Sequence, residues 1–252
     1  MRGPEWNFTS HHGAVGVGGL NKKTVVIHQP DFAPYLGFFH RFLYADMYIA
    51  LDHVQYVSGG RGWTNRDKIK TVQGEKWLTV SVKKAPLYTA INQIELSSNA
   101  DWRKQNLSLL EQNYRSAPCY NELMPKIEGL YARPGQMLCD FTIGSIEMLM
   151  DLLDVRIPWV WSSSLDPVGA KNELLVDLLK KVSATHYLSG VGARDYFKAE
   201  PFGQAGIEVV WQGFTHPVYA QQFGDFVPYL SALDVLFNHG IELSRKILRS
   251  SG

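Results

Sequence analysis

The chain has 252 residues, of which 45% are hydrophobic, 12% aromatic and 19% charged, as in an ordinary folded globular protein. Its 25 Lys and Arg residues nearly balance its 24 Asp and Glu residues, so charge gives no reason to expect nucleic acid or an anionic membrane as a partner. No segment approaches the roughly 20 apolar residues of a membrane span, and the chain does not begin with an apolar secretory segment. We therefore expect a cytoplasmic protein with no membrane span.

Metal and cofactor motifs are missing from the sequence. Cys119 and Cys139 have neither CxxC spacing nor a nearby His pair, which predicts reduced thiols rather than a zinc site or disulfide. The sequence also lacks an HExxH motif and a phosphate-binding Gly-Lys-Ser/Thr loop. We expect no metal and no cofactor, and any group transfer would use a donor that is already activated.

The predicted elements alternate between strands and helices after an N-terminal tail. Residues 1–22 are rich in Gly and small polar residues without periodicity, which predicts a flexible tail, and residues 23–252 are interpreted as a single α/β domain. The pattern predicts a mostly parallel, Rossmann-like open sheet with a helical insertion at about 99–155 and C-terminal helices that begin at a Ser231 cap. Strands are expected at 24–27, 47–51, 77–82, 91–96 (paired with 77–82), 159–161, 186–188 and 207–211, with the first helix at 34–44.

Polar side chains follow the first two predicted strands, where open α/β sheets place their ligands. His28 and Gln29 end the first strand, and the ordinary pKa of a His, about 6.5, suits proton transfer. The alternative is a ring that hydrogen-bonds the turn. Asp52 ends the second strand and either orients His28, binds a substrate amine or caps a turn. Gln55 and Tyr56 follow it as candidate substrate-binding residues.

Three later segments contain further candidate substrate-binding residues. The first follows a Gly-rich loop and combines cations with an aromatic ring, the second follows a strand with small residues, and the third is a His-Pro cluster. Each segment has a structural alternative, namely solvated charges, a close turn or core packing. The candidates are Trp63, Asn65, Arg66 and Lys68 in the first segment, Ser189 and Asp195 in the second, and His216, Tyr219 and Gln221 in the third.

Separated motifs in consistent order resemble the WbqC-like protein family, a bacterial family associated with O-antigen and other polysaccharide gene clusters. They are HQPDFAPYLGFFHRF, ADMYIALDHVQY, WTNRDKIKT, KWLTVSV, LLKKVSATHYLSGVGARDYF and HPVYAQQFGDFVPYLSALDVLFNHG, and they cover residues 24 to about 248. The resemblance implies modification of sugars or related amines, with transfer of an amino acid such as glycine onto an amino sugar as a commonly proposed activity. The loop at 58–62 and the tail depart from the family pattern, which implies a shifted substrate in a specialised metabolite pathway.

The leading hypothesis is a biosynthetic acyl- or aminoacyltransferase. In it, His28 deprotonates the amine of a sugar or specialised metabolite, Asp52 assists, and Asn65, Arg66, Gln55 or backbone groups near Ser189 stabilise the oxyanion formed from an activated acyl donor. Two alternatives stay open. The same residues would serve an acid–base lyase, cyclase or isomerase acting on a small amine, or a noncatalytic metabolite-binding protein. The oligomeric state is left open.

Overall fold

Short apolar runs of the chain form one parallel sheet. The computed structural model describes residues 22–59, 62–99 and 101–251, so the predicted tail, apart from Lys22, lies outside the described residues. The sheet has five strands in the order β5-β2-β1-β6-β7, and every neighbouring pair is parallel. Its strands are β1 (Thr24–His28), β2 (Met47–Ala50), β5 (Trp159–Trp161), β6 (His186–Ser189) and β7 (Glu208–Trp211). The predicted Rossmann-like sheet is confirmed.

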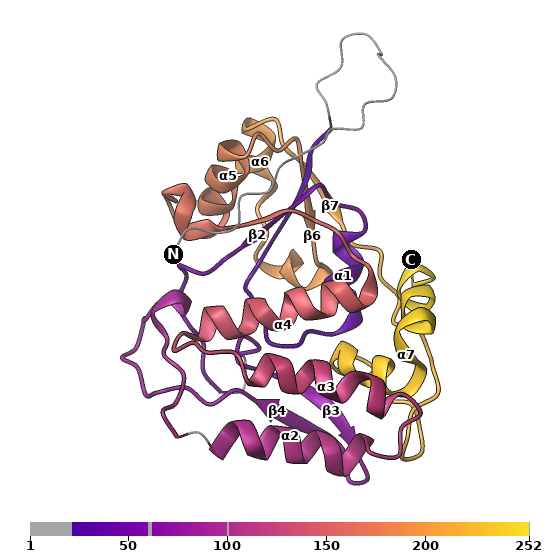
Figure 1. Cartoon of the computed structure of the whole chain (residues 1–252). Helices are drawn as coiled ribbons and strands as arrows, with labels where there is room; N and C mark the ends of the chain where they lie inside the picture. The colour runs from indigo at the N-terminus through magenta and orange to yellow at the C-terminus, as the bar shows by residue number, and fades with distance from the viewer. Residues whose placement is uncertain (1–21, 60–61, 100, 252) are drawn as a thin grey trace, which may run out of the picture.

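Helices cover both faces of this sheet, because its strands are apolar on both sides. Val25 and Ile27 pack with α5 (Lys171–Lys181) and α6 (Ala199–Gln204). The alternate residue Val26 belongs to a larger core on the other face. In Figure 1, α5 and α6 lie on the opposite side of the sheet from α1 and α4. The larger core includes α1 (Leu36–Phe42), α4 (Leu138–Leu153) and α7 (Ala232–Arg249), and α2 (Asp101–Tyr114) and α3 (Tyr120–Tyr131) of the helical insertion also contribute to it.

The predicted helical insertion corresponds to α2 (Asp101–Tyr114), α3 (Tyr120–Tyr131) and α4, which lie between β4 (Gly74–Thr79) and β5 in the chain. The last helix begins where the sequence predicts, since the Ser231 hydroxyl accepts a hydrogen bond of 3.3 Å from the Leu233 N–H. It bends at Gly240, whose φ of 71° favours glycine and whose missing side chain leaves room for Cys119. None of the helices in the described segments is long and apolar enough to cross a membrane.

A two-stranded antiparallel hairpin stands apart from the main sheet, and here one prediction holds only in small part. The strand partner of β4 (Gly74–Thr79) is β3 (Arg66–Thr71), and the predicted pairing of 77–82 with 91–96 is reduced to one isolated antiparallel bridge between Val82 and Leu96. Ile91–Gln93 instead forms a short 3₁₀ turn, η1. The polar composition of β3, Arg-Asp-Lys-Ile-Lys-Thr, resembles a loop, yet most of its side chains are buried. Two further 3₁₀ turns are η2 (Ser162–Leu165) and η3 (Val191–Tyr196).

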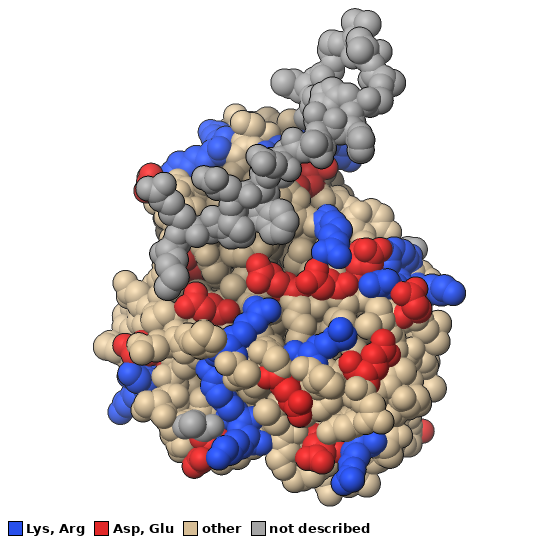
Figure 2. All heavy atoms as spheres, viewed as in Figure 1, with Lys and Arg blue, Asp and Glu red and all other residues tan. Residues whose placement is uncertain are grey.

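The strand order places a topological switch point between β1 and β6. From β1 the chain builds outward through β2 to β5 and then returns to add β6 on the other side of β1. Ligands of open α/β sheets bind beyond the carboxyl ends of the strands at such a point. On the face shown in Figure 2, acidic and basic side chains of the described residues are interspersed, in keeping with their nearly equal numbers.

Candidate functional site

His28 ends β1 beside the switch point, as the sequence predicts. Its Nδ1 lies 3.0 Å from the carbonyl oxygen of Gln29. Because a carbonyl only accepts hydrogen bonds, Nδ1 carries the proton and Nε2 is the basic nitrogen. The ring packs edge-to-face on Phe38, with 5.2 Å between centroids. Burial and then the Arg41 charge lower the pKa of His28 to about 3, although 37% of its side chain is accessible. The imidazole is therefore neutral and recessed among protein atoms.

The carboxylate beside His28 is Asp31, which sequence reasoning missed. Its Oδ2 lies 3.5 Å from His28 Nδ1, and 14% of its side chain is accessible. Its Oδ1 is buried and has no hydrogen-bond partner among the described residues. Burial raises the pKa of Asp31 to about 7, against the lowering effect of Arg41. A carboxyl with this pKa exchanges its proton near neutrality, as general acid–base catalysis requires.

Arg41 supplies a buried positive charge next to this pair. It lies on α1, where the whole segment is buried, and only 4% of the residue is accessible. Its guanidinium carbon lies 5.4 Å from the centre of the Phe38 ring, the ring that also contacts His28. Neither a carboxylate nor a carbonyl of the described residues pairs with the guanidinium, and Nε is buried without a partner. Buried charges are normally paired, so this arrangement leaves Arg41 available to a ligand.

Asp52 does not accompany His28, which corrects the predicted pairing. Its carboxylate accepts hydrogen bonds from the Ser162 hydroxyl at 2.8 Å, the Ser163 hydroxyl at 2.6 Å and the Ser163 N–H at 2.9 Å. Asn92 adds a fourth bond at 3.3 Å. The His53 Nδ1 atom lies 2.6 Å from the Ser162 hydroxyl, whose one hydrogen points to Asp52. Asp52 thus links the end of β2 to the 3₁₀ turn η2 that follows β5. This is the turn-capping role, one of the three roles considered for Asp52 from the sequence.

The candidates after the Gly-rich loop lie in or just before the β3–β4 hairpin, and none of the hydrogen bonds or ring contacts that they make within the described residues involves His28. The Arg66 guanidinium donates to the carbonyl oxygens of Gly62 and Gly59 and lies 4.1 Å from the centre of the Trp77 ring. Lys68 pairs with Glu75 at 2.7 Å. Buried Asn65 donates to the Val80 carbonyl at 2.9 Å. Trp63 is 42% exposed against Trp77, Tyr56 is half-buried and Gln55 is exposed.

The strand-end candidates Gln29 and Ser189 do lie at the switch point. Gln29 Oε1 accepts a hydrogen bond of 3.1 Å from the Thr64 hydroxyl, which ties β1 to the segment before β3. Ser189 is buried at the end of β6, and its hydroxyl makes only long contacts of 3.4 and 3.5 Å. Asp195 is exposed on η3. Ser189 thus ends its strand at the switch point with its hydroxyl toward Tyr187, on the α5/α6 side of the sheet, whereas Asp195 faces solvent.

The candidates of the His-Pro cluster, His216, Tyr219 and Gln221, do not share one environment. His216 donates from Nδ1 to the Pro217 carbonyl at 3.0 Å, and its ring lies 5.1 Å from that of Tyr229. Gln221 receives the buried ammonium of Lys70 at 3.2 Å and the Val227 N–H at 2.8 Å. Tyr219 is buried near the same cluster. Gln221 therefore orders the segment before α7, while His216 keeps a buried, unpartnered Nε2.

Two sequence signals could have revealed Asp31 and Arg41. Asp31 lies within the quoted HQPDF motif, three residues after His28, and the turn returns its carboxyl toward the ring. Arg41 lies three residues after Phe38, so both share one face of a short, otherwise apolar helix. In the segments that the structure describes, no group of three or more His, Cys, Asp or Glu residues is arranged to hold a metal ion.

Comparisons with known proteins identify the family of the chain. The WbqC-like protein family matches residues 29–246. The chain belongs to the WbqC-like family. It is also 31% identical over 227 residues to the uncharacterized protein Rv1507c of Mycobacterium tuberculosis, an alignment that covers 87% of this chain and 95% of that protein. No solved structure matches the chain. The matched residues begin just after His28 and include Asp31 and Arg41.

Proposed function

We propose that this WbqC-like protein is a small-molecule biosynthetic enzyme that transfers an acyl or aminoacyl group onto an amine of a sugar or specialised metabolite. The observation that carries the proposal is the His28–Asp31 pair, a neutral imidazole 3.5 Å from a carboxyl whose pKa is raised to about 7. The pair lies at the switch point, where α/β sheets bind ligands. A carboxyl with a raised pKa beside an imidazole at such a place supports chemistry rather than packing.

The pair changes the proton acceptor that the sequence suggests. A base is most effective when its pKa lies near the working pH, and a pKa of about 3 makes His28 a weak base. Asp31, with a pKa of about 7, matches the task better. Ionised Asp31 takes the proton of the substrate ammonium, and His28, whose Nδ1–H is engaged by the Gln29 carbonyl, accepts a hydrogen bond from the amine at Nε2. The neutral amine then attacks.

The transfer step requires one proton acceptor and an activated donor. The amine nitrogen forms a bond to the acyl carbon, the carbonyl becomes an oxyanion, and its collapse breaks the bond to the leaving group, which departs with the second proton of the amine. Asn65 and Arg66 donate to backbone carbonyls of their own hairpin, so we assign oxyanion stabilisation to neither residue. The chain's part in this reaction is to orient the amine and to hold the released proton on Asp31.

High-resolution mass spectrometry of reactions with the metabolite extract of the producing cells tests the function. The protein is compared with Asp31→Asn and His28→Gln, and with Asp140→Asn, which alters an exposed carboxylate on α4. We expect a product heavier than an amine in the extract by an acyl or aminoacyl group, formed by the wild type and Asp140→Asn but not by Asp31→Asn. A product of unchanged mass, or one lighter by water or ammonia, would replace transfer by lyase, cyclase or isomerase chemistry. Ligand retention without any product would indicate a binding protein.

A further inference from the structure

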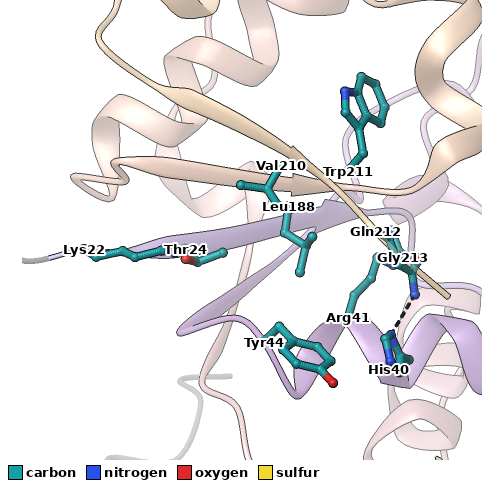
Figure 3. Close-up of a pocket in the computed structure, with 10 residues that line it drawn as sticks. All are labelled: Lys22, Thr24, His40, Arg41, Tyr44, Leu188, Val210, Trp211, Gln212 and Gly213. Carbon is teal, nitrogen blue, oxygen red and sulfur yellow. Dashed lines mark hydrogen bonds between the residues drawn. The ribbon is translucent and has the colours of Figure 1, made fainter. Parts of the chain in front are cut away.

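A pocket of about 430 Å³ lies beside α1 on the face of the sheet formed by β6 and β7. This volume is in the range of small-molecule sites. Figure 3 shows Arg41 extending from α1 toward Gln212, with Leu188 and Val210 on the neighbouring strands. The pocket is lined by Lys22, Thr24, His40, Arg41, Tyr44, Leu188, Val210, Trp211, Gln212 and Gly213.

The charged residues that line this pocket are all basic. Lys22 and Arg41 line the pocket, and no Asp or Glu is among the lining residues of the described chain. The chain as a whole has nearly equal numbers of acids and bases, so the local excess is specific to the pocket. A low-dielectric cavity with positive charge and no counter-charge attracts an anion.

Two N–H donors on side chains that line the pocket lack partners in the described part of the chain. The Gln212 amide nitrogen donates to the Gly37 carbonyl at 2.8 Å, which fixes its orientation, and it also lies 3.3 Å from His40 Nδ1. His40 Nδ1 is therefore the acceptor, and Nε2 carries the hydrogen. That Nε2 and the Nε of Arg41 are both buried without a partner among the described residues. Unpaired buried donors are costly, and a ligand oxygen would satisfy them.

The guanidinium also reaches the switch point. A Cβ added to Gly190, which follows β6, would lie 3.7 Å from Arg41 Nη1 and 4.0 Å from Gln212 Oε1. The missing side chain of Gly190 thus leaves the guanidinium open at the carboxyl end of β6. On its other side, the charge of Arg41 acts on both His28 and Asp31. Arg41 connects the pocket with the acid–base pair.

We propose that this pocket binds a small molecule through an anionic group, a carboxylate or a phosphate, which Arg41 and His40 receive while its apolar part lies against Leu188 and Val210. Binding of an anion in this pocket does not depend on the proposed function. Only the assignment of the bound molecule as a reactant of the His28–Asp31 pair rests on it. The planar fork of Arg suits the two oxygens of either anion, and the small apolar wall suits a short hydrocarbon portion.

Binding of simple anions tests the proposal without any turnover. Inorganic phosphate, butyrate and neutral butyramide are titrated into the full-length protein while the Nε–H resonances of its arginines are followed by ¹H–¹⁵N NMR. The Arg41 resonance is assigned by its loss in Arg41→Lys. We expect this resonance to shift with phosphate or butyrate but not with butyramide. The anion that binds more tightly shows whether the pocket prefers a phosphate or a carboxylate. No shift with either anion would overturn the proposal.

Calorimetric titration of variants provides the second readout. We expect Arg41→Met to weaken binding of the preferred anion about tenfold to hundredfold, since hydrogen bonds to charged groups are lost. Arg115→Met removes an exposed guanidinium on the α2–α3 connection and should bind as the wild type does. Equal binding by Arg41→Met and the wild type would overturn the proposal. If Arg41→Met fails to fold, Arg41→Lys is titrated in its place. Loss of turnover with anion binding intact would instead count against the proposed reaction alone.

Discussion

Asp31 and Asp52 follow neighbouring strands of one sheet, yet their surroundings differ in a way that separates chemistry from architecture. Asp52 is 3% accessible and accepts four hydrogen bonds, from two serines and Asn92. Asp31 lies 3.5 Å from one imidazole nitrogen, and its second oxygen has no partner in the described part of the chain. A carboxylate with all its hydrogen bonds made is held in place by the fold, whereas one with a free oxygen can take up a proton or bind a substrate.

The largest expected effect separates the two carboxylates by activity. Asp31→Asn should lower turnover of the proposed substrate by about 10²–10⁴-fold, because the proton acceptor is lost. Its free energy of unfolding should change by no more than about 1 kcal/mol, since Asn resembles the protonated carboxyl that Asp31 becomes below a pH of about 7. Steady-state kinetics and urea unfolding of one preparation measure both quantities. Full turnover by Asp31→Asn would show that Asp31 is not the proton acceptor.

The reverse pattern is expected at Asp52. Asp52→Ala should lower the free energy of unfolding by about 3 kcal/mol, because the buried Ser162 hydroxyl and the Ser163 N–H lose their acceptor. For a chain of this size, the melting temperature should fall by about 2–4 °C per kcal/mol. Calorimetry measures the loss, and turnover per folded molecule should stay near that of the wild type. If Asp52→Ala were stable but inactive, Asp52 would have a role in the reaction, as the sequence first suggested.

The sequence predicts well at which edge of the sheet the candidate site lies. It predicts less well which residues form the site. Alternating apolar runs identify the parallel strands, and strand ends come just before Gln29 and Asp52. Which carboxylate stays open depends on partners far away in sequence, since the serines that engage Asp52 lie at 162 and 163. Their distance along the chain leaves no local pattern. The same holds for β3, whose polar residues become buried only against β4 and later helices.

Titration of the His28–Asp31 pair should distinguish it from ordinary surface groups. The pKa of Asp31 is raised from 3.8 to about 7, so its contribution to stability is complete below 3.8 and is lost as pH rises to about 7. The pKa of His28 is lowered from 6.5 to about 3, so its contribution is complete above 6.5 and is lost as pH falls to about 3. Between 3.8 and 6.5 the two slopes oppose each other in the wild type.

Single variants should expose each slope separately. Relative to the wild type, the free energy of unfolding of His28→Gln should fall as pH rises between 3.8 and 6.5, because only the Asp31 slope is left. That of Asp31→Asn should rise over the same window, because only the His28 slope is left. Urea unfolding at several pH values measures both differences, with Asp140→Asn as the control. Two variants that run parallel to the wild type would show that neither group carries a large pKa shift.

The smallest expected effect concerns the charge that both groups share. Arg41→Met should raise the free energy of unfolding by about 1 kcal/mol, because it replaces an unpaired buried guanidinium by an apolar side chain of similar length. Since Arg41 lowers the pKa of Asp31, its removal should also move the rise of activity with pH to higher pH. Urea unfolding and a pH–rate profile measure the two changes. If Arg41 were instead paired within the fold, Arg41→Met would be destabilised by about 3–5 kcal/mol, as when one partner of a buried ion pair is removed. The sign of this change thus decides whether the positive charge is held for the fold or for a ligand.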